Sequence, residues 1–462
     1  MDRFDLVTIG SGPAGEKGAA QAAYFGHVVA LVDRVPRPGG APVNSGGIPS
    51  KTLREAALYL TGFGRREVYG VGLGLGPELI LERLHSRARE VQQHMGEEVR
   101  RNLDRHEIEY IVGEAALADG GVRVRLDGGE DRMLDAAVVL IATGSRPFHP
   151  DGIPFDDPDV HDSDTILGID RIPGSMVVIG SGPVGVEYAS IFTALGVSVT
   201  VVDIADRITP FLDVEVSDVL RRHMEEDGVR IALGTTAIID RVDGVLQVSL
   251  GDGETLRPDV VLFAAGRVGN TEQLGVSVAG VECDDRGRIV VDDEYRTTVE
   301  GIYAAGDVIG PPALASVSAE QGRVAICHAF DIPFKEMIDP LPPYGVYSVP
   351  EVGMVGMTEE AAAAAGIDFE VGRAWFADNT RSAIAGTRNG FIKLVLERDT
   401  KRLIGAHIVG EEAAELIHQA QAVIHTRGTI DYFIDSTYNV PTRSEAFKYA
   451  AYDALQRLSK AG

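Results

Sequence analysis

Two glycine-rich segments hold the residues whose types and spacing point most directly to chemistry. One reads Gly10-Ser11-Gly12-Pro13-Ala14-Gly15, and the other reads Gly180-Ser181-Gly182-Pro183-Val184-Gly185. In such a Gly-x-Gly-x-x-Gly turn the first glycine permits the tight turn. The second lets the backbone approach a pyrophosphate, and the third lets a helix pack close on a strand. The two segments therefore predict two dinucleotide-binding sites in one chain.

The elements that must position each turn are predicted in the same order in both copies. Strands are expected over 4–9 and 27–32 around a helix over 16–25, and again over 175–179 and 197–202 around a helix over 186–195. The second strand of each copy ends at an acid, Asp33 or Asp203, placed to bond a ribose hydroxyl. A lone glycine motif is a weak signal, but two complete copies indicate one site for FAD and one for a nicotinamide nucleotide.

Three more apolar, strand-like segments are followed closely by a glycine. The strand expected over 136–141 runs into Ala142-Thr143-Gly144, and that over 259–263 into Ala264-Ala265-Gly266-Arg267; the segment 301–307 ends at Asp307. In doubly wound sheets, ligands bind outside the carboxyl ends of the strands. We therefore predict ligand contacts at these ends rather than ordinary turns.

The rest of the chain predicts other kinds of structure. The polar, Arg- and Glu-rich stretch 78–102 is expected to be a solvated helical arm. From about Pro342 the pattern changes to a separate α+β domain with no nucleotide signature. Its strands are expected over 346–349, 370–376 and 390–396, and its helices over 411–427 and 444–458.

Composition narrows the range of functions. A chain of 462 residues is expected to form two to four domains. A formal charge of −26 argues against nucleic acid and anionic membranes as partners. The only cysteines are Cys283, after an apolar strand-like run, and Cys327, in a helix-like run, so we expect small core residues and no disulfide framework or zinc motif. With no leader and no apolar run of membrane length, a cytoplasmic protein is the expectation.

The segment Gly39 to Lys51, which ends Gly46-Gly47-Ile48-Pro49-Ser50-Lys51, resembles the active-site segment of the pyridine nucleotide–disulfide oxidoreductases. The resemblance covers essentially the whole chain and is closest to the soluble, FAD-containing transhydrogenases of that family. It rests also on the segments 141–147, 161–164, 185–190 and 439–446. It implies an α/β fold with two Rossmann-like dinucleotide-binding domains, for FAD and NAD(P), and a C-terminal α+β dimerisation domain. The implied limits are 1–150 with 270–340 for FAD, 151–269 for NAD(P) and 341–462 for a homodimer interface.

The resemblance also assigns site residues. Lys51 is implied beside flavin N5, paired with Glu187, and these two are the predicted catalytic residues. The FAD contacts implied are Gly10, Gly12, Pro13, Ala14, Gly15, Asp33, Arg34, Gly40, Ala41, Lys51, Ala142, Thr143, Gly144, Gly306, Asp307 and Ala315. The NAD(P) contacts implied are Gly180, Gly182, Val184, Gly185, Glu187, Asp203, Ile204, Ala265, Gly266 and Arg267. No metal ligand is predicted.

The sequence departs from the family pattern at the residues that carry thiol chemistry. Pro42 and Gly47 stand where the family has its two redox cysteines, and neither side chain can carry electrons. Val440 stands where disulfide reductases place a catalytic histidine, although the partnering acid position keeps Glu445. The missing base agrees with the missing thiols.

The loop after the second copy, Asp203-Ile204-Ala205-Asp206-Arg207, bears on the choice of nucleotide. A 2′-phosphate favours arginine near the ribose and is repelled by aspartate. Asp203 and the small Ala205 therefore favour NAD(H), while Arg207 leaves use of both nucleotides open.

These observations predict an FAD-dependent NAD(P)H oxidoreductase that works on small molecules without disulfide chemistry. Its leading acceptor is a second nicotinamide nucleotide, as in a transhydrogenase. An NAD(P)H:quinone reductase or diaphorase is the second hypothesis, and a non-catalytic FAD-binding redox sensor is the third.

Overall fold

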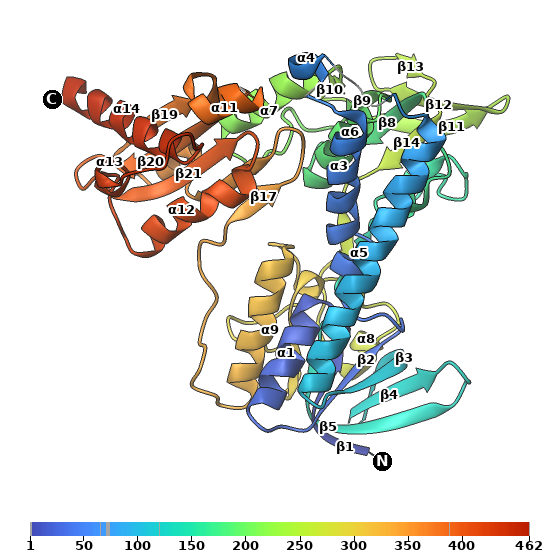
Figure 1. Ribbon diagram of the computed structural model, residues 1–462. Coiled ribbons are helices and arrows are strands. Elements are labelled where there is room, and N and C mark those ends of the chain that lie inside the picture. The colour runs from blue at the N-terminus through green and yellow to red at the C-terminus, as the bar shows by residue number, and fades with distance from the viewer. Residues whose placement is uncertain (1, 65, 71–73, 120, 388, 462) are drawn as a thin grey trace. The chain divides into compact units, whose positions relative to one another are not determined.

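The computed structural model describes residues 2–64, 66–70, 74–119, 121–387 and 389–461 (Figure 1). The chain divides into two compact units, and each draws on several stretches of sequence. The first comprises Met1–Leu53, His85–His149 and Gly266–Pro340. The second comprises Arg54–Leu84, Pro150–Ala265 and Leu341–Gly462.

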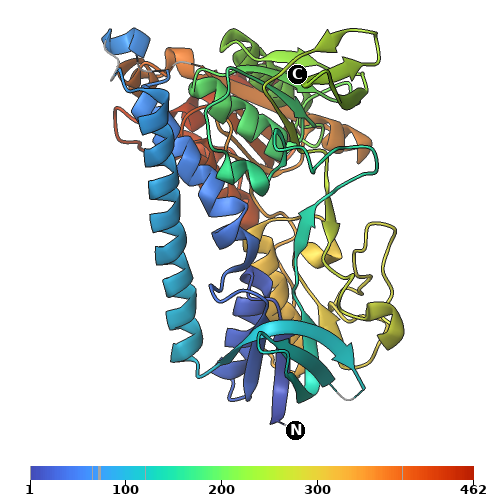
Figure 2. The ribbon, with the colours of Figure 1, turned by 90° about the vertical axis from the view of Figure 1, so that its right-hand side faces the viewer.

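A parallel sheet organises the first unit. Its strands follow one another in the order β3 (Glu109–Ala118), β2 (Val29–Asp33), β1 (Asp2–Ile9), β5 (Asp131–Ile141) and β16 (Ile302–Ala304). The C-terminal half of β3 pairs with β4 (Gly121–Leu126), and β4 pairs with the start of β5. The strands β3, β4 and β5 therefore also form an antiparallel meander. Figure 2 shows this meander beside the N-terminus.

The two faces of this sheet are covered differently, because alternate residues of each strand point to opposite faces. Leu6 and Leu140 pack under α1 (Pro13–Tyr24) and α9 (Ala315–Ala329), two helices that lie side by side (Figure 1). They approach closely at Gly322, where an added Cβ would lie 2.1 Å from the carbonyl oxygen of Ala14. Val7 and Ile141 face the meander instead.

Shorter elements complete the first unit. They are α2 (Gly40–Asn44), α8 (Val276–Ala279), the turn Asp307–Ile309, and the antiparallel pair β6 (Ser145–Pro147) and β15 (Arg267–Gly269). Two longer helices, α3 (Gly47–Thr61) and α5 (Pro77–Arg105), each run across a limit between the units. The predicted polar arm is the helix α5, most of whose side chains are exposed or half-buried.

The second unit begins with another parallel sheet. Its order is β10 (Arg230–Ala232), β9 (Ser198–Val202), β8 (Ser175–Ile179), β14 (Val260–Phe263) and β7 (Val160–Asp162). Helix α6 (Pro183–Ala194) follows β8, and α7 (Val214–Glu226) lies between β9 and β10 in the sequence. The antiparallel strands β11 (Ala237–Val242), β12 (Val245–Leu250) and β13 (Thr255–Leu256) share a core with the sheet through Val248 and Val261.

The C-terminal part of the second unit is an antiparallel sheet with helices packed on it. The strand order is β17 (Tyr344–Val346), β18 (Val352–Gly356), β21 (Leu403–Val409), β20 (Phe391–Glu397) and β19 (Phe369–Trp375). The helices are α10 (Glu359–Ala364), α11 (Thr380–Ala385), α12 (Ala413–His425), α13 (Asp431–Asp435) and α14 (Glu445–Ala461). Phe376, Phe433 and Phe447 are fully buried in the core that joins sheet and helices.

The predicted α/β class, with two Rossmann-like domains and a C-terminal α+β domain, is confirmed. Two local predictions are wrong. The strand expected over 346–349 lies at Tyr344–Val346, and Pro350, which has no N–H for a strand ladder, follows it. The apolar run before Cys283 forms the short helix α8 because Gly275 and Gly280, both at positive φ, bracket it.

The described residues include no helix long and apolar enough to cross a membrane.

Candidate nucleotide-binding sites

The first glycine turn joins β1 to α1 and has the geometry that a pyrophosphate needs. Gly10 has a φ of +104°, which favours glycine, and an added Cβ there would lie 2.3 Å from the carbonyl oxygen of Ala142. A Cβ on Gly15 would lie 1.8 Å from the carbonyl oxygen of Gly10, so only glycine lets the helix start this close to the strand. No side chain caps α1, which leaves its first N–H groups for an anion.

The acid at the end of β2 holds this turn. Asp33 Oδ2 accepts hydrogen bonds from Ser11 N at 2.7 Å and from Ser11 Oγ at 2.6 Å. Ser11 Oγ in turn accepts one from Gly39 N at 3.1 Å. One carboxylate thus fixes the glycine turn and the start of the segment 39–51.

The second turn repeats this arrangement between β8 and α6. Gly180 has a φ of +108°, and a Cβ on Gly185 would lie 1.9 Å from the carbonyl oxygen of Gly180. Asp203 Oδ2 accepts hydrogen bonds from Ser181 N at 2.5 Å and Ser181 Oγ at 2.8 Å. Helix α6 also lacks a side-chain cap. The internal repeat seen in the sequence is therefore a repeat in hydrogen bonding as well.

At the middle glycine of each turn, neither the backbone conformation nor the packing of the protein itself requires a glycine. Gly12 and Gly182 have φ values of −65° and −70°, which any residue can adopt. The atom nearest an added Cβ lies 3.8 Å away at Gly12, and none lies within 4 Å at Gly182. Glycine at both positions fits the close approach of a phosphate to the backbone. Both turns thus fit a dinucleotide.

The segment after β2 contributes to the first site. A Cβ on Gly40 would lie 2.6 Å from Gly12 Cα, so Gly40 and its neighbour Ala41 lie against the first turn. Arg34 is exposed beside Asp33. Burial and the charge of Asp33 raise the pKa of Tyr110, whose hydroxyl donates to the carbonyl oxygen of Val35 at 2.6 Å.

The predicted flavin end of the first unit is tied together by polar contacts. Asp307 accepts hydrogen bonds from Ser318 Oγ at 3.1 Å and Ser145 Oγ at 3.3 Å. Arg267 donates to Ser145 Oγ at 2.8 Å, and both Arg267 and Gly266, which are predicted as NAD(P) contacts, lie in the first unit.

The strand end at Ala142 is braced in the same unit. Thr143 Oγ1 donates to the carbonyl oxygen of Asn270 at 2.8 Å, and Asn270 Nδ2 donates to that of Thr143 at 2.9 Å. Gly306 has a positive φ, and its N–H donates a hydrogen bond to Gln321 Oε1. Ala315 is the first residue of helix α9. These predicted FAD residues therefore all lie in the first unit, whereas Gly180, Gly182, Val184, Gly185, Asp203, Ile204 and Ala265 lie in the second unit.

Pro42 and Gly47 are neighbours in space. A Cβ built on Gly47 would lie 3.5 Å from Pro42 Cβ. That separation falls within the range of about 3.5–4.5 Å found between the Cβ atoms of disulfides. The structure thus places the two residues as the family's cysteines would have to lie. The chain's own cysteines lie elsewhere, Cys327 buried and Cys283 half-buried.

The predicted catalytic residues lie on two helices. Lys51 is half-buried on α3, and its Nζ lies 3.4 Å from Ser50 Oγ. Glu187 is buried on α6 and accepts a hydrogen bond from Tyr347 N at 2.9 Å. Lys51 belongs to the first unit and Glu187 to the second, so their pairing stays a prediction.

Comparison with known proteins decides the family. The model of the pyridine nucleotide-disulphide oxidoreductases matches residues 4–322, and that of their dimerisation domain matches residues 342–451. The chain belongs to this family. Its members are FAD-dependent NAD(P)H oxidoreductases, and this protein is one of them.

Relatives cover the whole length of this oxidoreductase. A soluble pyridine nucleotide transhydrogenase of Mycobacterium tuberculosis is 41% identical over 99% of this chain and 98% of its own. One of Colwellia psychrerythraea is 38% identical over 98% of both chains. Among solved structures, LpdA from Mycobacterium tuberculosis matches with a TM-score of 0.88 at 28% identity, over 98% of this chain and 99% of its own. The flavoprotein disulfide reductase RclA from Escherichia coli, as its Cu(II) complex, matches equally well at 27% identity over the same shares.

Sequence reasoning missed the residues that hold the predicted contacts in place. Ser11 and Ser181 carried a signal, since both copies have serine between their first two glycines. Asn270 and Ser145 carried none, because each is distant in sequence from the residue that it holds, and Ser318 belongs to no motif that pointed to Asp307.

The open middle glycines give a direct test of nucleotide binding. We expect Gly182→Ala to leave folding intact but to raise the KM for the nicotinamide nucleotide by about ten-fold or more, or ~1.4 kcal/mol, because the methyl group would occupy the place of a phosphate. Gly12→Ala should fold and lose FAD. Steady-state kinetics, flavin content and melting temperature measure these effects.

Gly185→Ala is the matched comparison for the glycine test, because its methyl group meets backbone rather than open space. It should lower the melting temperature, whereas Gly182→Ala should not. An unchanged nucleotide KM in folded Gly182→Ala would contradict the placement of the pyrophosphate.

Proposed function

We propose that this oxidoreductase passes hydride from NAD(P)H through FAD to a second nicotinamide nucleotide, as a soluble transhydrogenase does. The observation that carries the proposal is the pair of open glycine turns combined with Pro42 and Gly47 in the disulfide positions. Both turns fit a dinucleotide, and neither Pro42 nor Gly47 could form a disulfide. Relatives named as soluble transhydrogenases support the same reading.

FAD would lie in the first unit, with its pyrophosphate on the turn at Gly10, Gly12 and Gly15 and its ribose on Asp33. Asp307, Thr143 and Gly144 would hold the flavin end. The bound flavin supplies reversible two-electron chemistry. The chain's own contribution is to orient the ring, and the braces from Ser318 and Asn270 make that end rigid.

Lys51 and Glu187 have complementary roles in the proposal. The Lys51 ammonium would stabilise the negative charge that develops on the flavin ring when hydride arrives. The Glu187 carboxylate would keep that ammonium charged and oriented. Glu187 is buried and already fixed by the Tyr347 N–H, which suits a positioning role.

The nicotinamide nucleotide would lie on the second turn, with its ribose at Asp203. Ala205 N donates to Asp203 Oδ1 at 2.9 Å, so the carboxylate is held at the mouth of the loop. Ile204 is 76% exposed and therefore available to an adenosine. Donor and acceptor nucleotides would use this one site in turn.

A quinone reductase is the second candidate, favoured by one observation. Pro42 is apolar, Gly47 has no side chain, and both are half-buried, so the disulfide positions would offer apolar contacts to a ring. A non-catalytic FAD-binding sensor is the third, and turnover with any dye would exclude it.

The setting proposed is a cytoplasmic homodimer acting on small molecules, with no nucleic acid or membrane partner. The match to the dimerisation domain over residues 342–451 supports the homodimer. The proposed domain limits are 1–150 with 270–340 for FAD, 151–269 for NAD(P) and 341–462 for dimerisation.

The function is tested by offering the purified holoprotein NADPH with an NAD analogue, a quinone, or a disulfide such as lipoamide or glutathione. We expect exchange between nucleotides to exceed quinone reduction, and we expect no disulfide reduction. Faster turnover with quinone would replace the proposal by the second candidate, and NAD(P)H-dependent disulfide reduction would overturn it.

Lys51→Ala should keep FAD but slow flavin reduction by about a hundred- to a thousand-fold, the usual effect of losing one charge-stabilising contact in such a site. Glu187→Ala should slow the same step less, because it only disorders Lys51. Stopped-flow measurement under anaerobic conditions gives the rates. Wild-type rates in Lys51→Ala would reject the assignment.

NADH should be preferred over NADPH by roughly ten-fold or more in kcat/KM, because the Asp203 carboxylate repels a 2′-phosphate. The double substitution Asp203→Asn with Ala205→Arg should narrow or reverse the preference by removing that repulsion and adding a phosphate partner. Steady-state kinetics with both nucleotides decide the matter. Equal or better use of NADPH by the wild type would show that Asp203 does not set the preference.

A further inference from the structure

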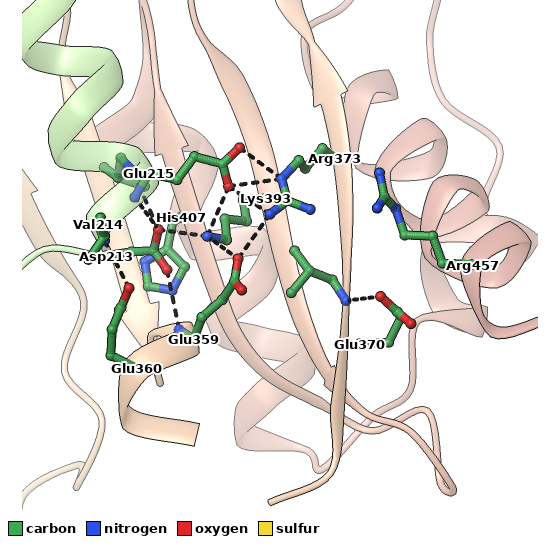
Figure 3. Close-up of polar contacts among 12 residues, drawn as sticks. Asp213, Val214, Glu215, Glu359, Glu360, Glu370, Arg373, Lys393, His407 and Arg457 are labelled. Atoms are coloured by element: carbon green, nitrogen blue, oxygen red, sulfur yellow. Dashed lines mark hydrogen bonds and ion pairs between the residues drawn. The ribbon is translucent and has the colours of Figure 1, made fainter. Parts of the chain in front are cut away.

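A buried lysine of the C-terminal sheet lies among three carboxylates, two of which come from the start of α7 and one from α10 (Figure 3). Lys393, on β20, is 1% exposed. Its Nζ lies 2.6 Å from Asp213 Oδ1, 3.0 Å from Glu215 Oε2 and 2.5 Å from Glu359 Oε1. We call these four residues and Arg373, which bridges Glu215 and Glu359, the Lys393 cluster.

The charges in this cluster keep one another ionised. Burial alone would lower the pKa of Lys393, but its hydrogen bonds to the carboxylates outweigh burial and raise that pKa. Burial would likewise raise the pKa of Asp213, and its neighbours His407 and Lys393 lower it overall. Removing one partner of a buried ion pair leaves an uncompensated charge, so each group depends on the other.

Asp213 is more than a partner for the lysine, because it also accepts hydrogen bonds from backbone N–H groups in the first turns of two helices. Its Oδ1 accepts hydrogen bonds from Glu215 N at 3.1 Å and Val216 N at 3.4 Å, which makes it the N-cap of α7. Its Oδ2 accepts one from Glu359 N at 3.2 Å, in the first turn of α10. Lys393 therefore fixes the carboxylate on which the start of α7 depends.

The segment that ends at Asp213 is the loop from Asp203 that carries the nucleotide-specificity positions. One contact joins this loop to the second glycine turn: the N–H of Thr209, in the loop, donates to the carbonyl oxygen of Ser181, in the turn, at 2.9 Å. The loop is tied to α7 by Ser217 Oγ, which donates to the carbonyl oxygen of Ile208 at 2.7 Å.

The same loop contains a strained residue. Thr209 is fully buried at a φ of +41°, and its Oγ1 is buried without a hydrogen-bond partner among the described residues. A β-branched residue at positive φ is strained and persists only where its surroundings hold it. Contacts that hold the loop on both sides of Thr209, those of Ser181 and of Asp213, fit such a conformation.

We propose that Lys393 is a positioning residue for the nicotinamide nucleotide, acting from the C-terminal domain through Asp213 on the loop 203–213. It touches no substrate. It holds the start of α7, and thereby the loop in the shape that presents Asp203 to the ribose. This proposal rests on the proposed nucleotide site at the second glycine turn.

The test compares Lys393→Met and Asp213→Ser with the wild-type holoenzyme. Serine is as good an N-cap as aspartate but is too short to keep the contact with Lys393. The Asp213→Ser variant therefore keeps the helix cap and loses the ion pair with the lysine. We expect both variants to raise the KM for NADH by about five- to thirty-fold, with kcat and FAD content close to wild type. Because both act through one contact, their effects in the double variant should not add.

The matched control is Arg398→Met, which removes a cation that bridges Asp368 and Glu370 at the end of the same strand, away from α7. Its KM should stay at the wild-type value. A general loss of stability would instead lower flavin content, melting temperature and kcat together.

The inference is overturned if KM stays within about two-fold of wild type in the folded variants, or if their effects are additive. If Lys393→Met does not fold, the KM of Asp213→Ser alone decides. A wild-type protein that oxidises neither NADH nor NADPH would contradict the proposed function, whereas an active wild type with unaffected variants would contradict only this inference.

Discussion

The rest of the structure depends on one contact that occurs twice, the hydrogen bonds from a serine to the carboxylate at the end of the second strand. Asp33 and Asp203 each accept from both the N–H and the hydroxyl of a serine in the glycine turn. This contact fixes a turn in which the middle glycine has open space beside it and the helix N-terminus has no side-chain cap. A phosphate can then approach the backbone, and the same carboxylate remains beside the place of the ribose.

The two copies are embedded differently, and the difference suits their proposed roles. In the first, Ser11 also binds Gly39, so the turn is joined to the segment that contains Pro42, Gly47 and Lys51. A tightly held FAD is expected of such a site. In the second, the loop after Asp203 is anchored through Asp213 to Lys393, in another domain. A nucleotide that must enter and leave in every cycle would depend on how firmly that loop is held.

Much of this could be predicted from the sequence because the decisive signals are local. Both glycine motifs, their strands and helices, and the acids at 33 and 203 lie within short stretches of chain. The contacts that brace the sites could not be predicted, since Asn270 holds Thr143 and Lys393 holds Asp213 across more than a hundred residues. The prediction of a strand in the apolar run before Cys283 is wrong, because a short run of apolar residues is equally typical of a helix. The glycines at 275 and 280, which bracket the helix, are the signal that favours it.

The central claim is that electrons pass through the flavin without a dithiol store, and an anaerobic titration of the holoprotein with NADH tests it most directly. A disulfide is itself a two-electron couple and would take up a second equivalent of reductant. With Pro42 and Gly47 in the cysteine positions, we predict that a single equivalent of NADH per FAD bleaches the flavin absorption completely, with no charge-transfer band from a thiolate. Uptake of two equivalents per FAD, with such a band, would contradict the account.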